Sequence, residues 1–144
     1  MNGNDFMSWV LRSPFHGLLS GGMLLLTVTG RKTQKKYTLP VGYYEEGHCL
    51  WVLTSRNRTW WRNLNDGAEV EILLKRKNLH GFAEIASDGK LVELRLVDYL
   101  KHVPKAAKPM KIRIENNIPN PQDLARTAIE RLFVKITLTN EAPN

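Results

Sequence analysis

The chain has 144 residues, of which 42% are hydrophobic and 24% are charged. This composition excludes a disordered chain, and the length suffices for one domain with a substantial hydrophobic core. The 21 basic and 14 acidic residues leave a net charge of +7. That charge favours a polyanionic partner (nucleic acid, an anionic membrane surface or a phosphorylated small molecule), or it only aids solubility.

The cellular compartment is predicted from features that the sequence lacks. Its start has neither the basic segment nor the cleavage site of a signal peptide. The most apolar stretch, residues 18–28, is far shorter than the roughly 20 residues of a membrane-spanning helix. The single cysteine, Cys49, excludes an intrachain disulfide. We therefore expect a cytoplasmic protein without a transmembrane segment.

The first part of the chain predicts one short helix followed by strands. Apolar residues recur with helical spacing in residues 5–12. Residues 23–29 are almost entirely apolar, as in a buried central strand, and residues 36–44 alternate as a strand. Pro40 has no backbone N–H, so this second strand should be an edge or leave a gap at that point. A turn then leads to a strand over residues 49–54.

The middle of the chain predicts a single helical turn and a β-hairpin. The helical turn covers residues 60–64. The hairpin strands are residues 69–75 and 79–86, on either side of a polar turn. Residues 132–138 alternate again and form the final predicted strand.

Two helices are predicted between the hairpin and the final strand. The first covers residues 90–102, with Ser87 as its N-cap. Its buried side is expected to carry four regularly spaced apolar residues, namely Leu91, Leu94, Val97 and Leu100. Asn120 followed by proline starts the second helix, which runs to about residue 130. The basic segment 104–118 fits no predicted element.

The order of these elements predicts the fold class. Tight loops rather than helical crossovers join the strands, which indicates antiparallel pairing. We expect a mainly β (α+β) fold, with about six antiparallel strands closed into a small barrel and helices packed outside it. No repeat, linker or low-complexity segment interrupts the chain. Residues 1–144 are therefore expected to form a single domain, with its core at about residues 14–139.

Most signatures of catalysis are absent from the sequence. The four histidines are scattered, with no second ligand at metal spacing, so no metal site is expected. Neither a nucleotide-binding glycine motif nor a nucleophile elbow occurs. Cys49 falls inside a predicted strand, where an inert buried thiol is expected. The chemistry must therefore be sought in two polar loops.

The first polar loop joins the first two predicted strands and is strongly cationic. Its four cations are Arg31, Lys32, Lys35 and Lys36. Such a cluster suits a phosphate or a carboxylate tail, because arginine can grip these groups with two hydrogen bonds. The same cluster also suits a solvated hairpin tip that blunts the edge of a sheet.

The second polar loop, residues 54–64, contains three arginines, a serine and two adjacent tryptophans. Neighbouring residues of a helix diverge by about 100°, so Trp60 and Trp61 cannot both face one core. One ring is expected in the core, and the other is left for a partner, a second subunit or a planar ligand. Arginine beside exposed aromatic rings also suits single-stranded nucleic acid.

Both loops resemble a known family, the deazaflavin-dependent nitroreductases and quinone reductases of the flavin-binding split-barrel superfamily. Residues 24–33 (LLLTVTGRKT) and 37–41 (YTLPV) are similar to the family's apolar strand, its Gly-Arg-Lys-Ser/Thr-Gly turn and its Thr-x-Pro strand. Ser55 and residues 60–64 (WWRNL) are similar to its serine loop and its Trp-Tyr-x-Asn-Leu helix. Gln34 stands where the family usually has glycine.

The resemblance, which extends from about residue 14 to residue 139, implies a split β-barrel. It also implies that the cationic turn binds the phosphate or acidic tail of the cofactor, and that the proline strand and serine loop contact its ring. The cofactor-binding residues carried over are Arg31, Lys32, Lys36, Pro40, Val41, Ser55, Arg56, Trp60 and Asn63. Further candidates for contact with the ring or the substrate are Tyr43, Tyr44 and Trp61.

The function implied by the resemblance is that of an oxidoreductase. It would bind the deazaflavin coenzyme F420, or FMN in its place, and transfer hydride to an electron-poor acceptor such as a quinone or a nitroaromatic. Because the cofactor carries the difficult chemistry, the lack of an acid–base constellation fits this role, and no catalytic residue is assigned. A non-catalytic flavin-binding protein and a basic nucleic-acid-binding barrel remain as alternatives. Split barrels of this superfamily often pair, so a homodimer is expected.

Overall fold

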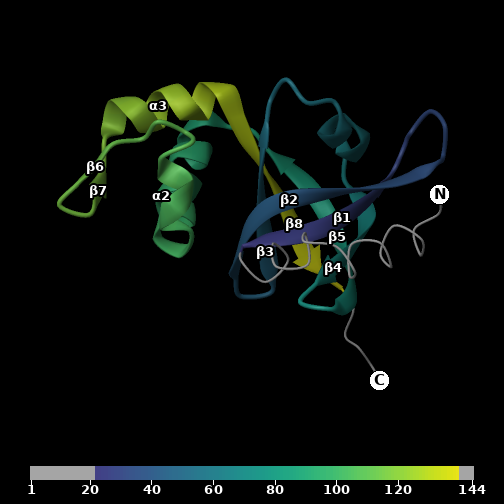
Figure 1. Ribbon diagram of the computed structural model, residues 1–144. Helices are drawn as coiled ribbons and strands as arrows, with labels where there is room; N and C mark the ends of the chain where they lie inside the picture. The colour runs from purple at the N-terminus through teal and green to yellow at the C-terminus, as the bar shows by residue number, and fades with distance from the viewer. Residues whose placement is uncertain (1–21, 140–144) are drawn as a thin grey trace.

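The computed structural model describes residues 22–139 of the chain. Its main feature is a closed barrel of six antiparallel strands in the order β1-β2-β3-β8-β5-β4 (Figure 1). These strands are β1 (Met23–Thr29), β2 (Lys36–Glu46), β3 (Cys49–Ser55), β4 (Ala68–Leu74), β5 (Lys77–Ala86) and β8 (Arg131–Leu138). The predicted fold class is confirmed, whereas the helix expected over residues 5–12 lies outside the described residues.

Alternate residues of the strands fill the interior of the barrel, as a period of two predicts. On β8, Leu132, Val134 and Ile136 are fully buried in this interior core. On β1 the interior residue Leu24 is fully buried, and its neighbour Leu25, on the opposite face, is only 3% exposed. The prediction that this first strand is apolar and buried on both faces is therefore confirmed.

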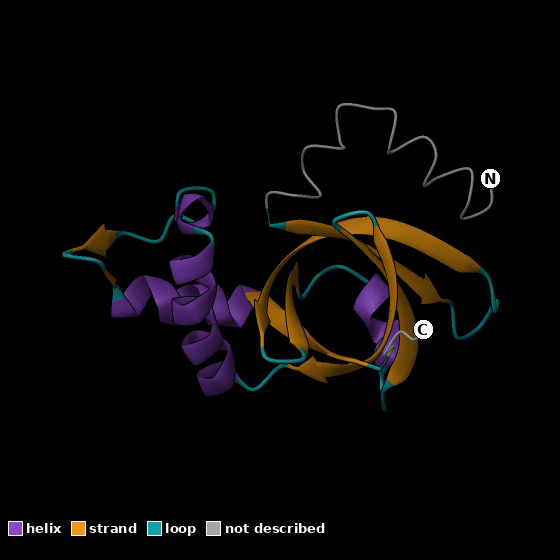
Figure 2. Cartoon of the chain, turned by 90° about the horizontal axis from the view of Figure 1, so that it is seen from below, coloured by secondary structure: helices purple, strands orange, loops and turns teal. Residues whose placement is uncertain are grey.

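A second core lies outside the barrel, under the helices α2 (Gly89–His102) and α3 (Pro121–Glu130). Figure 2 shows these helices packed together on one side of the barrel. Phe133 of β8 points outward into this core and is fully buried. Its ring meets that of Tyr99 on α2 edge-on, at 6.2 Å between centroids. The barrel therefore buries side chains on both of its faces where the helices cover it.

Helix α2 corrects two details of the sequence-based prediction. Its N-cap is Asp88 instead of Ser87, and the Asp88 carboxylate accepts a hydrogen bond of 3.1 Å from the backbone of Leu91. Leu94 is 67% exposed, and the buried side consists of Val92, Leu96, Tyr99 and Leu100. The helix carries two apolar stripes with helical spacing, and contact with the barrel selects the stripe that contains the large ring of Tyr99.

Strand β2 has a different partner strand along each of its halves. It pairs with β1 over residues 36–42, but with β3 over residues 42–46 alone. Residues 36–41 therefore have no strand partner on the β3 side, and Pro40 lies within this unpaired half. The expected gap at Pro40 is confirmed, because β2 pairs with β1 at this residue but has no partner strand on its β3 side. This gap opens one side of the barrel next to the loop after β3.

The basic segment that fitted no sequence pattern is organised by one buried carboxylate. The segment forms η3 (Pro104–Ala107), β6 (Ile114–Glu115) and β7 (Ile118–Pro119). The carboxylate of Asp123, in the first turn of α3, accepts hydrogen bonds from the backbone and side chain of Arg113 at 2.9–3.2 Å. Arg126 donates to the same carboxylate and to the carbonyls of Met110 and Lys111. Asp123 thereby attaches the segment to α3.

This attachment predicts an acid-sensitive stability. Hydrogen bonds from Arg113 lower the pKa of Asp123 from 3.8 to about 2. A carboxyl with a depressed pKa in the folded state stabilises the fold above its unfolded pKa, and this contribution is lost as the pH falls from about 4 to about 2. We expect the melting temperature of Asp123→Asn to depend less on pH in this window than that of the wild type. Parallel curves from a melting series at several pH values would contradict the assignment.

Candidate functional site

The cationic turn between β1 and β2 is held in shape by hydrogen bonds among its own residues. Gly30 exchanges backbone hydrogen bonds with Lys35 (2.8 Å) and Gln34 (2.9 Å). A Cβ at Gly30 would lie 2.8 Å from the Thr33 hydroxyl oxygen, so any larger residue there would displace the Thr33 side chain. Gln34 has a φ of +61°, which is costly for a residue with a Cβ, and its side chain donates to the Arg31 carbonyl at 2.9 Å. The turn thus keeps its geometry without the family's usual glycine at position 34.

Three of the four cations of this turn have no acidic partner. Lys36 forms an ion pair of 2.7 Å with Glu71 of β4, and this contact raises the Lys36 pKa. Arg31, Lys32 and Lys35 are exposed and form no ion pair with any residue between 22 and 139. The anion-binding capacity of the turn therefore rests on these three side chains.

Asn63 joins the cationic turn to the second polar loop. It lies in the short helix η2 (Trp60–Leu64), and its Oδ1 accepts a hydrogen bond of 3.0 Å from the backbone N–H of Arg31. Its Nδ2 donates to the Trp60 carbonyl at 3.0 Å and to the hydroxyl of Tyr37 on β2. The two motifs singled out in the sequence therefore meet in space, next to the unpaired half of β2.

One of the adjacent tryptophans lies in the core, as predicted, and the other is partly buried against the same core. Trp60 is 6% exposed inside the barrel, and its Nε1–H donates to the Thr54 hydroxyl at 3.1 Å. Trp61 is only partly buried, and the guanidinium of Arg62 lies 5.3 Å from the centre of its ring. A cofactor contact through Trp60 stays a prediction, and the more accessible ring is that of Trp61.

The serine loop is fixed by Arg56. Its guanidinium donates to the carbonyls of Arg131, Ser87 and Ala128 at 2.9, 2.7 and 3.0 Å. One of these carbonyls belongs to the last turn of α3, where a cation is favourable. The preceding residue, Ser55, is partly exposed, and its hydroxyl has no hydrogen bond with any described residue. Arg56 therefore holds the loop in place, and the Ser55 hydroxyl is available.

The remaining candidates on β2 lie on different sides of the strand. Pro40 is exposed in the unpaired half, whereas Val41 and Tyr43 are buried inside the barrel. Tyr44 belongs to the core under α2, where its hydroxyl accepts a hydrogen bond of 3.3 Å from Arg95. Burial raises the pKa of both Tyr43 and Tyr44. The site residues expected on this strand are therefore not gathered on one surface.

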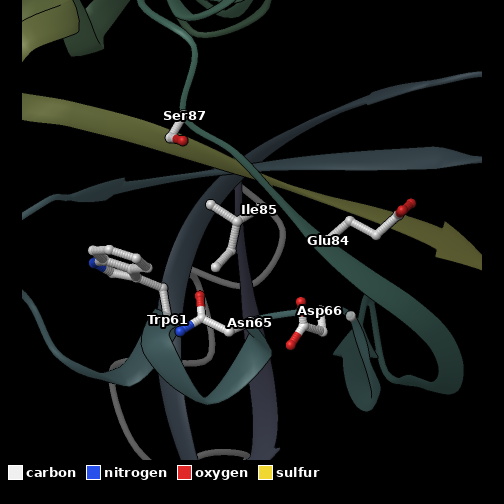
Figure 3. A pocket seen from close by; sticks show the side chains of 7 residues that line it. Trp61, Asn65, Asp66, Glu84, Ile85 and Ser87 are labelled. Atoms are coloured by element: carbon white, nitrogen blue, oxygen red, sulfur yellow. The ribbon is translucent and has the colours of Figure 1, made fainter.

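A shallow pocket of about 480 Å³ borders the second loop. Figure 3 shows Trp61 and Ile85 on its walls, with the carboxylates of Asp66 and Glu84 nearby. Ser87, whose backbone carbonyl accepts a hydrogen bond from Arg56, also lines the pocket. The pocket thus adjoins the loop that carries the candidate site.

Comparison with known sequences identifies the family. A model of the F420H(2)-dependent quinone reductase family matches residues 13–118, well over half of the chain. The chain belongs to this family. It is therefore an oxidoreductase, and the cofactor of its family is reduced F420. Among curated proteins, none matches the chain.

Solved structures similar to this F420H(2)-dependent quinone reductase family member share its fold. An F420-H2 dependent reductase, FDR-A, is 19% identical, with a TM-score of 0.54 over 82% of this chain and 94% of that chain. A proposed 5-nitroimidazole antibiotic resistance protein of Bacteroides thetaiotaomicron is 11% identical, with a TM-score of 0.60 over 85% and 76%. A domain-swapped dimer is 17% identical, with a TM-score of 0.56 over 92% and 94%. At these identities the likeness shows the fold alone.

The chemistry of the donor set fits the cofactor of this family. Reduced F420 carries a phosphate and a tail of carboxylates, and the turn offers three cations without acidic partners. No group of His, Cys, Asp and Glu that could hold a metal occurs in residues 22–139. Within the same range, none of the helices is long and apolar enough to cross a membrane. The three cations of the turn are suited to an anionic group.

The sequence analysis missed one residue of this region, Tyr37. Its side chain is 39% exposed at the start of the unpaired half of β2, and its hydroxyl accepts from Asn63. Desolvation raises the Tyr37 pKa, so the phenol stays protonated. An aromatic residue directly after a cationic turn was the signal in the sequence, but Tyr37 was considered only as part of the alternating strand over residues 36–44.

Proposed function

We propose that this family member binds reduced F420 and passes its hydride to an electron-poor acceptor such as a quinone or a nitroaromatic. The observation that carries the proposal is the junction of the cationic turn with η2 at the unpaired half of β2, in a chain of this family. Bound reduced F420 supplies the hydride, and one proton from solvent completes the reduction of a quinone to a quinol.

The residues of the chain bind and orient the cofactor in this proposal. Arg31, Lys32 and Lys35 would hold the anionic tail, because they are exposed cations on a turn of fixed shape. Pro40 and the Ser55 hydroxyl would contact the ring from the two sides of the gap in the barrel. Trp61, rather than the buried Trp60, is the aromatic side chain accessible to a planar ligand.

The proposal is tested by titrating the protein separately with reduced F420, with FMN and with a single-stranded oligonucleotide. Absorbance and fluorescence should show binding of F420 that is tighter than binding of FMN, and no binding of the oligonucleotide. Mixing the F420 complex with menadione without oxygen should then oxidise the cofactor and yield the quinol. Binding without oxidation of the cofactor would indicate a storage protein. Oligonucleotide binding alone would overturn the proposal.

Replacing the serine of the second loop tests the ring contact. A hydrogen bond from Ser55 to the ring is worth about 1 kcal/mol, so Ser55→Ala should bind F420 about 5-fold more weakly at an unchanged melting temperature. Thr139→Ala removes an exposed hydroxyl beyond the end of β8 that lies opposite the serine loop, so it is the control and should bind normally. Equal binding by both variants would remove Ser55 from the site.

We also expect the protein to form a homodimer. The partly exposed ring of Trp61 offers an aromatic anchor of the kind found in interfaces, and a solved protein of similar fold is a domain-swapped dimer. Light scattering at micromolar concentrations should give twice the mass of one chain. A mass of one chain over this concentration range would show that the protein is a monomer.

A further inference from the structure

Residues 31–35 of the cationic turn connect β1 and β2, which pair as far as Thr29 and Lys36, and Lys36 also forms an ion pair with Glu71. Four hydrogen bonds of this turn join its own members, between Gly30 and Lys35, Gly30 and Gln34, Arg31 and Gln34, and Thr33 and Lys35. Among residues 22–139, the bond from the Arg31 N–H to Asn63 Oδ1 is the only one that ties residues 31–35 to another element. Apart from the two strands that it connects, residues 31–35 are therefore held by one described side chain, that of Asn63.

The amide of Asn63 is fully engaged in this attachment. Both hydrogens of its Nδ2 are donated, one to the Trp60 carbonyl within η2 and one to the Tyr37 hydroxyl on β2. Its Oδ1 accepts from Arg31. Since Tyr37 stands on the strand that leaves the turn, the amide links three elements: the turn, η2 and the start of β2. No hydrogen of this amide is left to donate to a ligand.

We infer that Asn63 is a positioning residue, which together with Tyr37 holds the cationic turn so that its three unpaired cations are presented to the anionic tail on a fixed backbone. This inference rests on the proposed function and deepens it, because it assigns Asn63 to the turn instead of to direct contact with the cofactor. Holding a loop in its binding geometry before the ligand arrives increases affinity, since less conformational entropy is lost on binding. The benefit goes to the part of the ligand that the turn contacts, namely its tail.

The attachment itself is tested on the protein without any ligand. Deuterium uptake by the peptide covering residues 30–35 should be faster in Asn63→Ala than in the wild type, and intermediate in Tyr37→Phe, which removes a single hydroxyl. The matched control is Asn65→Ala, because Asn65 is an exposed asparagine whose side chain has no hydrogen bond with the described residues. Uptake by Asn63→Ala that equals the control would overturn the inference.

The consequence for binding is tested with two ligands, F420 and the same deazaflavin without its phosphate and tail. Asn63→Ala, which removes all three hydrogen bonds of the amide, should bind F420 about 5- to 10-fold more weakly, and Tyr37→Phe, which removes one, about 2- to 3-fold more weakly. Neither variant should change the affinity for the tail-less ligand. The dependence of F420 affinity on salt should also be shallower in Asn63→Ala, because loosely held cations contact the tail less.

Different experimental results would contradict this inference and the proposed function. If wild-type protein binds neither ligand, the proposed function fails. If wild-type protein binds F420 but Asn63→Ala weakens both ligands equally, Asn63 acts on the ring, and the positioning role is overturned. Should Asn63→Ala fold poorly, Tyr37→Phe decides alone, since the hydroxyl it removes is partly exposed and accepts only from Asn63 within the described residues.

Discussion

Replacing Trp60 by alanine is expected to destabilise the barrel by about 3–5 kcal/mol. The ring is 6% exposed, packs among the interior side chains of several strands, and donates a hydrogen bond to Thr54. Removal of the ring leaves a cavity and a hydroxyl that loses its donor. Denaturant unfolding should therefore show a lower midpoint with little change in slope.

The neighbouring tryptophan provides the matched control for this experiment. Trp61→Ala removes the same ring from a partly exposed position beside the pocket, so the free energy of unfolding should fall by much less. Trp61→Ala should instead weaken the binding of a planar ligand, because we propose that the Trp61 ring contacts such a ligand. Equal destabilisation by the two variants would contradict the division of roles between core and surface.

Replacing both Arg31 and Lys32 by alanine is expected to lower the affinity for F420 by at least about 10-fold, which corresponds to 1.4 kcal/mol. Both side chains are exposed and have no acidic partner among the described residues, so their charges are available to an anion. Screening limits such attraction to about 8–10 Å at ordinary salt, so the effect requires contact with the tail. The loss should be larger for F420 than for FMN, because the F420 tail carries more negative charge.

The control for the loss of two positive charges is Lys105→Ala/Lys108→Ala. These lysines are exposed on the helical side of the molecule, at and after η3. Isothermal titration of both double variants at low and moderate salt separates a local contact from the effect of net charge. If the two variants bind F420 equally, the turn is a solvated hairpin tip and not a binding element.

Alternation of apolar residues predicted the strands of the barrel, because each interior position such as Leu132 or Ile136 meets the same core. The order of the strands in the barrel could not be predicted in this way. The alternation of apolar residues along a strand indicates which side chains are buried, but it does not indicate which strand lies beside it. The buried face of α2 was mispredicted for a related reason. Leu94 and Leu96 belong to two different apolar stripes of the helix, and each stripe has helical spacing. Only the position of Phe133 on the barrel decides which stripe is covered.

The two loops of the candidate site were found from their cations and tryptophans, but the roles of individual side chains were not. Arg56 is a residue type that often binds anions. Its guanidinium, however, donates hydrogen bonds to three backbone carbonyls in distant parts of the chain. Lys36 is likewise engaged by Glu71, 35 residues away. Such partners are set by tertiary structure, so spacing in the sequence cannot separate a cation that holds the fold from one that is free to bind a ligand.

The position of β8 in the barrel has a consequence for how the protein is made on the ribosome. β8 is the final barrel strand in the sequence, but it lies between β3 and β5 and pairs with both. Until residues 131–138 have been synthesised, a nascent chain can pair β1 with β2 and β4, β2 with β3, and β4 with β5, but β3 and β5 each keep an open edge. Because Cys49 and Thr137 are 88 residues apart in the chain, closure waits for nearly the whole barrel. The barrel should therefore close after translation of β8, and not progressively as the strands emerge.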